Sequence, residues 1–160
     1  MTVLVPCDFN QAKAATIAAA KHVGPVYLRL GRSKMPNFTE EGAPFEIGKA
    51  QMLNEGSDVT LFACGHLVWE ALEAAKTLET EGIKAEVINI HTIKPLDKEA
   101  IIASARKTRA VVTCEEHLFN GGLGDSVAQT LAMNCPTPME YVAVDDKFGE
   151  SGTPDEMLTN

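Results

Sequence analysis

The arginines that close the second apolar segment of this sequence are its first candidates for chemistry. Arg29 lies within the segment 26–30, and Arg32 follows that segment. A guanidinium at the carboxyl end of a strand can hold a phosphate or a carboxylate through two parallel hydrogen bonds, although at most surface positions it forms an ion pair instead. Arg32 is therefore a candidate anion ligand, with Arg29 second to it.

A second candidate is the polar cluster 114–117, Cys-Glu-Glu-His, which is followed by Gly-Gly-Leu-Gly at 121–124. Glycines before a helix can bring backbone N–H groups close to an anion, as phosphate-binding loops do. The spacing matches neither GxxxxGK[ST] nor GxGxxG, and two adjacent carboxylates oppose a phosphate. The favoured interpretation is a tight turn in which the glutamates and the histidine satisfy local backbone groups or a neighbouring subunit, with phosphate binding as the alternative.

Cysteine and histidine pairs raise the hypotheses of metal binding and nucleophilic catalysis. Cys64 precedes His66, and Cys114 precedes His117, but a structural zinc site takes four ligands from two closely spaced pairs. The sequence has no GxSxG elbow, and its four cysteines, which show no CxxC spacing, are typical of reduced, buried thiols. His66 and His91 each follow a predicted strand, so each is interpreted either as a ligand contact or as a structural residue.

These side chains must be positioned by strands and helices that alternate along the chain. The strands are predicted over 2–5, 26–30, 50–53, 59–63, 85–90, 110–114 and 139–144, and the helices over 9–22, 67–80, 98–107 and 123–133. Asp8 and Asp97 precede the first and third helices and are predicted to cap them. This alternation predicts an α/β fold, a three-layer αβα arrangement with a mostly parallel sheet.

The first strand, helix and strand form a βαβ unit that is too small to be stable alone. Residues 31–48 then carry Pro36, Gly42 and Pro44 without a sustained helical or strand period. We interpret this stretch as a linker that detaches the leading βαβ unit, which we expect to be a remnant of a second domain. Residues 91–97 are predicted to be a link from strand to helix, turned by Pro95.

Length, composition and charge bound the function classes. The 160 residues are 45% hydrophobic and 22% charged, with a formal net charge of −8, so the sequence is that of a folded domain rather than a disordered chain. A negative chain is repelled by nucleic acid and by anionic membranes, and we expect neither as a partner. The apolar stretches are too short to cross a bilayer, and no targeting segment is visible, so a cytoplasmic location is the default expectation.

Five motifs occur together in the order seen in transketolases. They are Val-Pro-Cys-Asp at 5–8, Gly-Pro-Val-Tyr-Leu-Arg-Leu-Gly-Arg at 24–32, His-Thr-Ile-Lys-Pro-Leu-Asp at 91–97, Glu-Glu-His at 115–117 with the glycines of 121–124, and Phe-Gly-Glu-Ser-Gly-Thr-Pro-Asp-Glu at 148–156. The whole chain resembles the C-terminal section of a bacterial transketolase. By this resemblance, residues 1–36 are the end of the pyrimidine-binding domain, 37–48 a linker, and 49–160 the transketolase C-terminal domain.

The resemblance implies transfer of a two-carbon ketol unit between sugar phosphates, with thiamine diphosphate and Mg²⁺ in the complete enzyme. It implies no catalytic, cofactor-binding or metal-binding residue on this chain, which we expect to be mainly structural, dimer-forming and inactive by itself. The expected partners are an N-terminal transketolase section or subunit and further copies of the chain. Arg32 matches the family's arginine for the substrate phosphate, although the family shows Ser-Arg-Gln where this chain has Gly31-Arg32-Ser33. Asp8 also matches a family aspartate, but helix capping explains it.

Three alternatives stay open. The same domain occurs in deoxyxylulose-phosphate synthases and in the beta subunits of 2-oxoacid dehydrogenases, although the wording of residues 91–94 favours transketolase. A free-standing, flavodoxin-like module that binds a phosphorylated ligand at its strand ends would bind that ligand as an isolated chain. An interaction protein that exposes the leading βαβ unit as a docking surface would instead self-associate.

Overall fold

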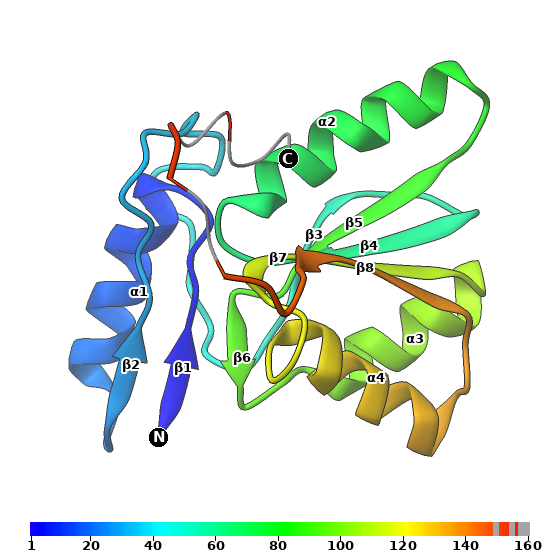
Figure 1. The fold of residues 1–160 in the computed structure, drawn as a ribbon. Coiled ribbons are helices and arrows are strands. Elements are labelled where there is room, and N and C mark those ends of the chain that lie inside the picture. The colour runs from blue at the N-terminus through cyan, green and yellow to red at the C-terminus, as the bar shows by residue number, and fades with distance from the viewer. Residues whose placement is uncertain (149–150, 154–155, 157–160) are drawn as a thin grey trace.

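The fold is built on two β-sheets of unequal size (Figure 1). The computed structural model describes residues 1–148, 151–153 and 156. The strands are β1 (Thr2–Leu4), β2 (Val26–Leu28), β3 (Gln51–Asn54), β4 (Val59–Ala63), β5 (Ala85–Asn89), β6 (Thr92–Lys94), β7 (Val111–Leu118) and β8 (Met139–Val144). The helices are α1 (Phe9–Lys21), α2 (Leu67–Thr80), α3 (Lys98–Thr108) and α4 (Leu123–Asn134). Four residues of the last sequence motif, 149–150 and 154–155, lie outside the described part of the chain.

The larger sheet has the strand order β3-β5-β4-β7-β8 and is parallel except for β3, which runs antiparallel to β5. Helix α2 covers one face, and α3 and α4 cover the other (Figure 1). Each face has its own apolar core, one centred on Phe62 and Ile101 and the other on Leu61 and Val68. The predicted three-layer α/β fold with a mostly parallel sheet is therefore confirmed.

The smaller sheet contains a strand that the sequence reasoning missed. Strand β1 pairs in parallel with β2, as predicted for the βαβ unit, but its other edge pairs with β6 in the antiparallel direction. Residues 91–97 were predicted to be a link alone, because three residues before Pro95 give no periodic signal. A contact between Val3 and Lys94, distant in sequence, makes this segment a strand.

The stretch 31–48 contains no helix or strand, as predicted. It nevertheless contacts both the leading βαβ unit and helix α2 of the larger unit. The Asp8 carboxylate accepts hydrogen bonds from the backbone N–H groups of Phe38, at 2.9 Å, and Thr39, at 2.6 Å. The Phe38 ring lies 5.6 Å from the ring of Trp69 on α2. The leading unit therefore packs on the larger one, while the domain boundaries placed at 36 and 48 remain a prediction.

The predicted helix caps are observed. Asp8 accepts a hydrogen bond from the N–H of Gln11 at the start of α1, and Asp97 accepts one from Ala100 at the start of α3. Strand β7 continues four residues beyond the predicted end at Cys114, because Leu118 pairs with Val144 after a shift of register. This extension carries the acidic cluster out along the sheet.

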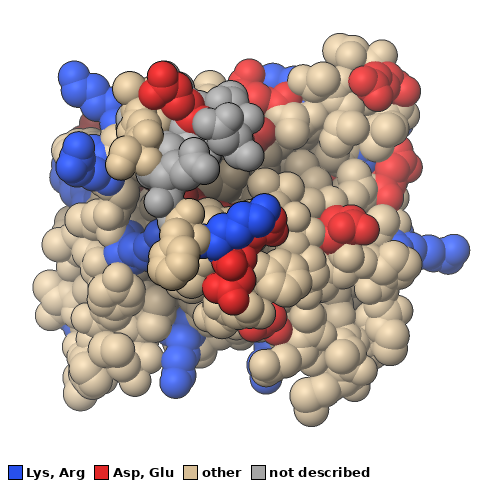
Figure 2. All heavy atoms as spheres, in the orientation of Figure 1, with Lys and Arg blue, Asp and Glu red and all other residues tan. Residues whose placement is uncertain are grey.

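Helix length and surface charge bear on the two classes of partner that the composition disfavours. Within the described residues, no helix is both long and apolar enough to span a membrane. Figure 2 shows acidic and basic side chains interspersed on one face of the molecule, without a continuous basic surface there. That face therefore offers no electrostatic track for a nucleic-acid backbone.

Candidate functional site

Three of the segments singled out in the sequence meet at one place, where strands β2, β4 and β7 end. The guanidinium of Arg29, after β2, donates a 2.6 Å hydrogen bond to the backbone carbonyl of Glu116 in β7. The Nδ1 atom of His66, at the start of α2, lies 3.6 Å from the Glu116 carboxylate. The ring of His66 also lies directly against Gly31, in the segment that follows Arg29. The fold thus gathers a guanidinium, an imidazole and a carboxylate from three separate motifs.

Arg32, the predicted phosphate ligand, lies in the segment that leaves this meeting point. Its side chain is exposed and has no hydrogen-bond or ion-pair partner among the residues that the structure describes. Arg29 behaves differently, because its guanidinium is committed to Glu116. Of the two arginines, Arg32 therefore has the guanidinium that faces solvent without a partner in the described structure.

The glycine-rich turn before α4 binds the carboxylate of one of the protein's own residues, Glu115. The buried carboxylate of Glu115 accepts hydrogen bonds from the N–H groups of Leu123, at 2.7 Å, and Gly124, at 2.8 Å. A Cβ at Gly122 would overlap this carboxylate, so glycine is required there by space. Glu115 occupies the place that a phosphate would take at the helix N-terminus, and the turn interpretation describes this site.

The two cysteines of the cysteine and histidine pairs lie next to each other, one directly after β4 and one in β7, where the Cys64 N–H donates a 3.2 Å hydrogen bond to the Cys114 carbonyl. Burial, followed by the charge of Glu115, raises the pKa of both the Cys64 and Cys114 thiols to about 12, so both stay protonated at neutral pH. A thiol is a poor nucleophile and a poor metal ligand compared with a thiolate. The described part of the chain also contains no group of three or more His, Cys, Asp or Glu side chains placed to hold a metal ion.

His91 is a structural residue. It is 5% exposed, and its ring lies 4.1 Å from the ring of Phe45. Burial lowers the pKa of His91 to about 4, so the imidazole is neutral at pH 7. It packs the stretch 31–48 onto the sheet instead of facing a ligand.

A buried polar network connects the leading unit to the larger sheet, and it was not predicted from the sequence. The side-chain amide of Asn89, at the end of β5, donates to Cys7 Sγ at 3.3 Å and to Gln11 Oε1 at 3.0 Å. Gln11 in turn donates to Gln51 at 3.0 Å. The signal available in the sequence was an asparagine closing an apolar strand, which requires a polar partner when it is buried.

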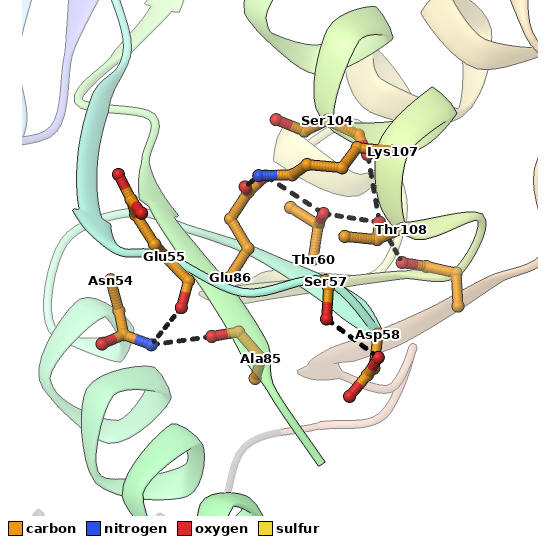
Figure 3. Close-up of polar contacts among 11 residues, drawn as sticks. Asn54, Glu55, Ser57, Asp58, Thr60, Ala85, Glu86, Ser104, Lys107 and Thr108 are labelled. Atoms are coloured by element: carbon orange, nitrogen blue, oxygen red, sulfur yellow. Dashed lines mark hydrogen bonds and ion pairs between the residues drawn. The ribbon is translucent and has the colours of Figure 1, made fainter.

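A second missed network lies around the buried Glu86 of β5 (Figure 3). Its carboxylate forms an ion pair with Lys107 of α3. Thr60 donates a 3.3 Å hydrogen bond to the same carboxylate, and the Thr60 and Thr108 hydroxyls lie 2.7 Å apart. This network joins two strands to α3, and the sequence signal was a charge between Ala85 and Val87 in an otherwise apolar strand.

Comparison with known proteins identifies the family to which this fold belongs. The family model described as "Transketolase, C-terminal domain" matches residues 48–160. The chain belongs to this family. It is 49% identical over 155 residues to the 6-deoxy-6-sulfo-D-fructose transketolase subunit of Clostridium sp. (strain MSTE9), covering 97% of this chain and 48% of that protein. It is 36% identical to the 1-deoxy-D-xylulose-5-phosphate synthase of Heliobacterium modesticaldum (strain ATCC 51547 / Ice1), covering 96% of this chain and 24% of that protein.

A solved structure titled "Split gene transketolase, inactive beta4 tetramer" superposes on this chain with a TM-score of 0.96 and 48% sequence identity. The alignment covers 99% of this chain and 52% of that one. The chain thus spans about half the length of the curated transketolase relatives that it matches. The resemblance read from the sequence motifs, to the C-terminal section of a transketolase, is confirmed.

The family implies thiamine diphosphate and a divalent metal in the complete enzyme. A metal-bound diphosphate needs carboxylate or carbonyl ligands for the metal and free N–H groups for the phosphates. In the described part of this chain no cluster suits the metal, and the N–H groups at the start of α4 are taken by Glu115. The described residues do not fit this group.

Proposed function

We propose that this chain is the C-terminal section of a split transketolase, which acts in a complex with a separate N-terminal section. The observation that carries the proposal is the near-complete superposition on about half of a chain titled a split-gene transketolase. The 49% identity to a protein named as a transketolase subunit supports transketolase over the synthase alternative. The partner supplies the residues for the cofactor, and the pair transfers a ketol unit between anionic sugars.

Within this assembly, Arg32 holds the anionic end of the sugar. Its side chain is exposed, and a guanidinium offers the paired N–H donors that a phosphate or sulfonate accepts. Thiamine diphosphate, when bound to the complete enzyme, supplies the carbanion chemistry of the transfer. The contribution of this chain is to bind and orient the sugar through the end remote from the reacting carbon.

Reconstitution tests the proposal. The purified chain, the proposed N-terminal section, and their mixture are each titrated with thiamine diphosphate and Mg²⁺ by calorimetry and then assayed for ketol transfer from xylulose 5-phosphate to ribose 5-phosphate. We expect binding and turnover in the mixture and neither in this chain alone. Turnover by this chain alone, or an inactive mixture that nevertheless forms a stable complex, would overturn the proposal.

The role of Arg32 is tested in the active mixture. Arg32→Ala should raise KM for the phosphorylated acceptor by at least tenfold, because a hydrogen-bonded ion pair to the phosphate is lost. Arg106, an exposed arginine of α3, provides the matched control, since Arg106→Ala removes the same charge elsewhere. Equal KM values for the two variants would show that Arg32 does not bind the phosphate.

A further inference from the structure

We propose that His66 positions the Arg32 segment by packing its ring against Gly31, so that the C-terminal domain sets the geometry of the anion site. The inference rests on the proposed function of Arg32. It assigns to a residue outside the leading βαβ unit an effect on sugar binding, and it explains why glycine precedes Arg32 in this chain.

The first observation is the space at Gly31. A Cβ built on Gly31 would overlap the imidazole of His66, with three ring atoms within 3 Å of it. The backbone of Gly31 is not among the positive-φ glycines, so glycine is not required there by conformation. It is required by the ring that lies against it.

The second observation is that the ring itself is held. The side chain of His66 is only 16% exposed, and its Nδ1 faces the Glu116 carboxylate at 3.6 Å. The carbonyl of His66 accepts a hydrogen bond from the N–H of Trp69 in the first turn of α2. Rotation of the imidazole away from Gly31 therefore breaks its approach to Glu116, while the backbone hydrogen bond to Trp69 fixes the main chain from which the ring projects.

The third observation is that both ends of the Arg32 segment are fixed to the same domain. On one side, Arg29 is bonded to the Glu116 carbonyl, and on the other, the Phe38 ring lies against Trp69. Between these anchors, the His66 ring contacts Gly31, the residue that directly precedes Arg32. A displacement of Gly31 at this point shifts the backbone that carries the guanidinium.

A size-exchange experiment in the reconstituted enzyme tests this inference. The variants are Gly31→Ala, His66→Ala and the double variant Gly31→Ala/His66→Ala, with Arg32→Ala as reference. Hydroxypyruvate, a ketol donor without a phosphate, is paired with erythrose 4-phosphate or with erythrose, two acceptors that differ only in the phosphate. The readout is the ratio of kcat/KM for the two acceptors, and near-ultraviolet circular dichroism of each chain checks folding.

We expect Gly31→Ala to lower this ratio about tenfold or more, since a displacement of about 1 Å at a binding group costs up to about a hundredfold. The rate with erythrose should stay near its original value. His66→Ala, which creates no overlap, should lower the ratio by a smaller factor. The double variant should recover most of the loss of Gly31→Ala, because the methyl group then enters the space that the ring vacates.

An unchanged ratio in Gly31→Ala, or a double variant at least as impaired as Gly31→Ala, would overturn the inference. If Gly31→Ala fails to fold, the comparison of the double variant with His66→Ala decides instead: equal ratios support positioning by the ring, and a further loss contradicts it. An Arg32→Ala variant with an unchanged ratio would refute the proposed anion site itself. The two failures are therefore distinguishable.

Discussion

Asp8 joins α1 to the stretch 31–48. Its substitution should therefore destabilise the packing of this stretch as well as the start of α1. Asp8 as a whole is 4% exposed, and its carboxylate accepts four hydrogen bonds, from the N–H groups of Gln11, Phe38 and Thr39 and from the Thr39 hydroxyl. Asp97 caps α3 in a similar way but accepts only two, from Ala100 and Ala50. The two aspartates form a matched pair.

The magnitude follows from these bonds. Loss of an N-cap costs about 1 kcal/mol, and each hydrogen bond to a charged acceptor contributes about 1.5–3 kcal/mol. Because Phe38 and Thr39 are half-buried, water replaces part of what is lost. We expect Asp8→Ala to lower the free energy of unfolding by about 3 kcal/mol and Asp97→Ala by about half as much.

Urea denaturation at a fixed protein concentration measures both values. Trp69 is the sole tryptophan and lies 5.6 Å from Phe38, so its fluorescence reports on this stretch while circular dichroism reports on the helices. Amide hydrogen exchange at Phe38 and Thr39 should also accelerate in Asp8→Ala. Equal costs for the two variants, with unchanged exchange at 38 and 39, would refute the argument that Asp8 ties these segments together.

The pH dependence carries a definite sign. Burial by itself raises the pKa of Asp8, but the hydrogen bonds from Gln11, Thr39 and Phe38 outweigh it and hold the pKa below its usual value. The contribution of Asp8 is therefore fully present above the unfolded pKa of about 4 and is lost as pH falls through the folded pKa. The stability gap between the original chain and Asp8→Asn should narrow below about pH 4. A constant gap would contradict the assignment.

Three further variants test the other buried groups. Glu115→Gln should destabilise by about 2 kcal/mol, with faster hydrogen exchange confined to the first turn of α4, because one charge-assisted hydrogen bond is lost. Lys107→Met should cost about 3 kcal/mol in urea unfolding by leaving Glu86 buried without its cation, and the added change Glu86→Gln should recover part of that loss. His91 has a pKa of about 4 when folded, so the unfolded state takes up its proton first as pH falls. Stability should decline by up to about 3 kcal/mol between pH 6.5 and 4, and His91→Gln should remove that decline.

The sequence was sufficient for the local structure because each element carries its own signal. Ala-rich and amphipathic periods gave α1 and α2 to within a residue or so, and the caps at Asp8 and Asp97 came from residue type and position. Strand β6 gave no such signal, because three residues are too few for a period. It exists through its pairing with β1, about ninety positions away in the chain.

The candidate site was predictable in its parts and not in its assembly. Arg29 stands in the last part of a predicted strand, and His66 and Glu116 each follow one, but nothing in the spacing of these residues says that they meet. Their meeting depends on the parallel order β4-β7 and on the seating of β2 beside them. The same holds for Asn89 and Cys7, whose contact links the two sheets. Residue type identifies a polar group in need of a partner, and only topology identifies the partner.

The charge of the chain determines which groups near the end of β2 could attract an anionic sugar in the proposed complex. The chain carries a net charge of −8, so an anionic sugar is repelled by most of the surface and needs a local cation to approach. The N-terminus of α4 cannot supply the attraction, because Glu115 has already neutralised it. Arg29 is occupied by the Glu116 carbonyl, which leaves Arg32 as the guanidinium of this segment that is open to an anion. If Arg32 binds the sugar as proposed, the ring of His66 against Gly31 sets where that guanidinium stands, and His66 and Arg32 act as one unit in binding.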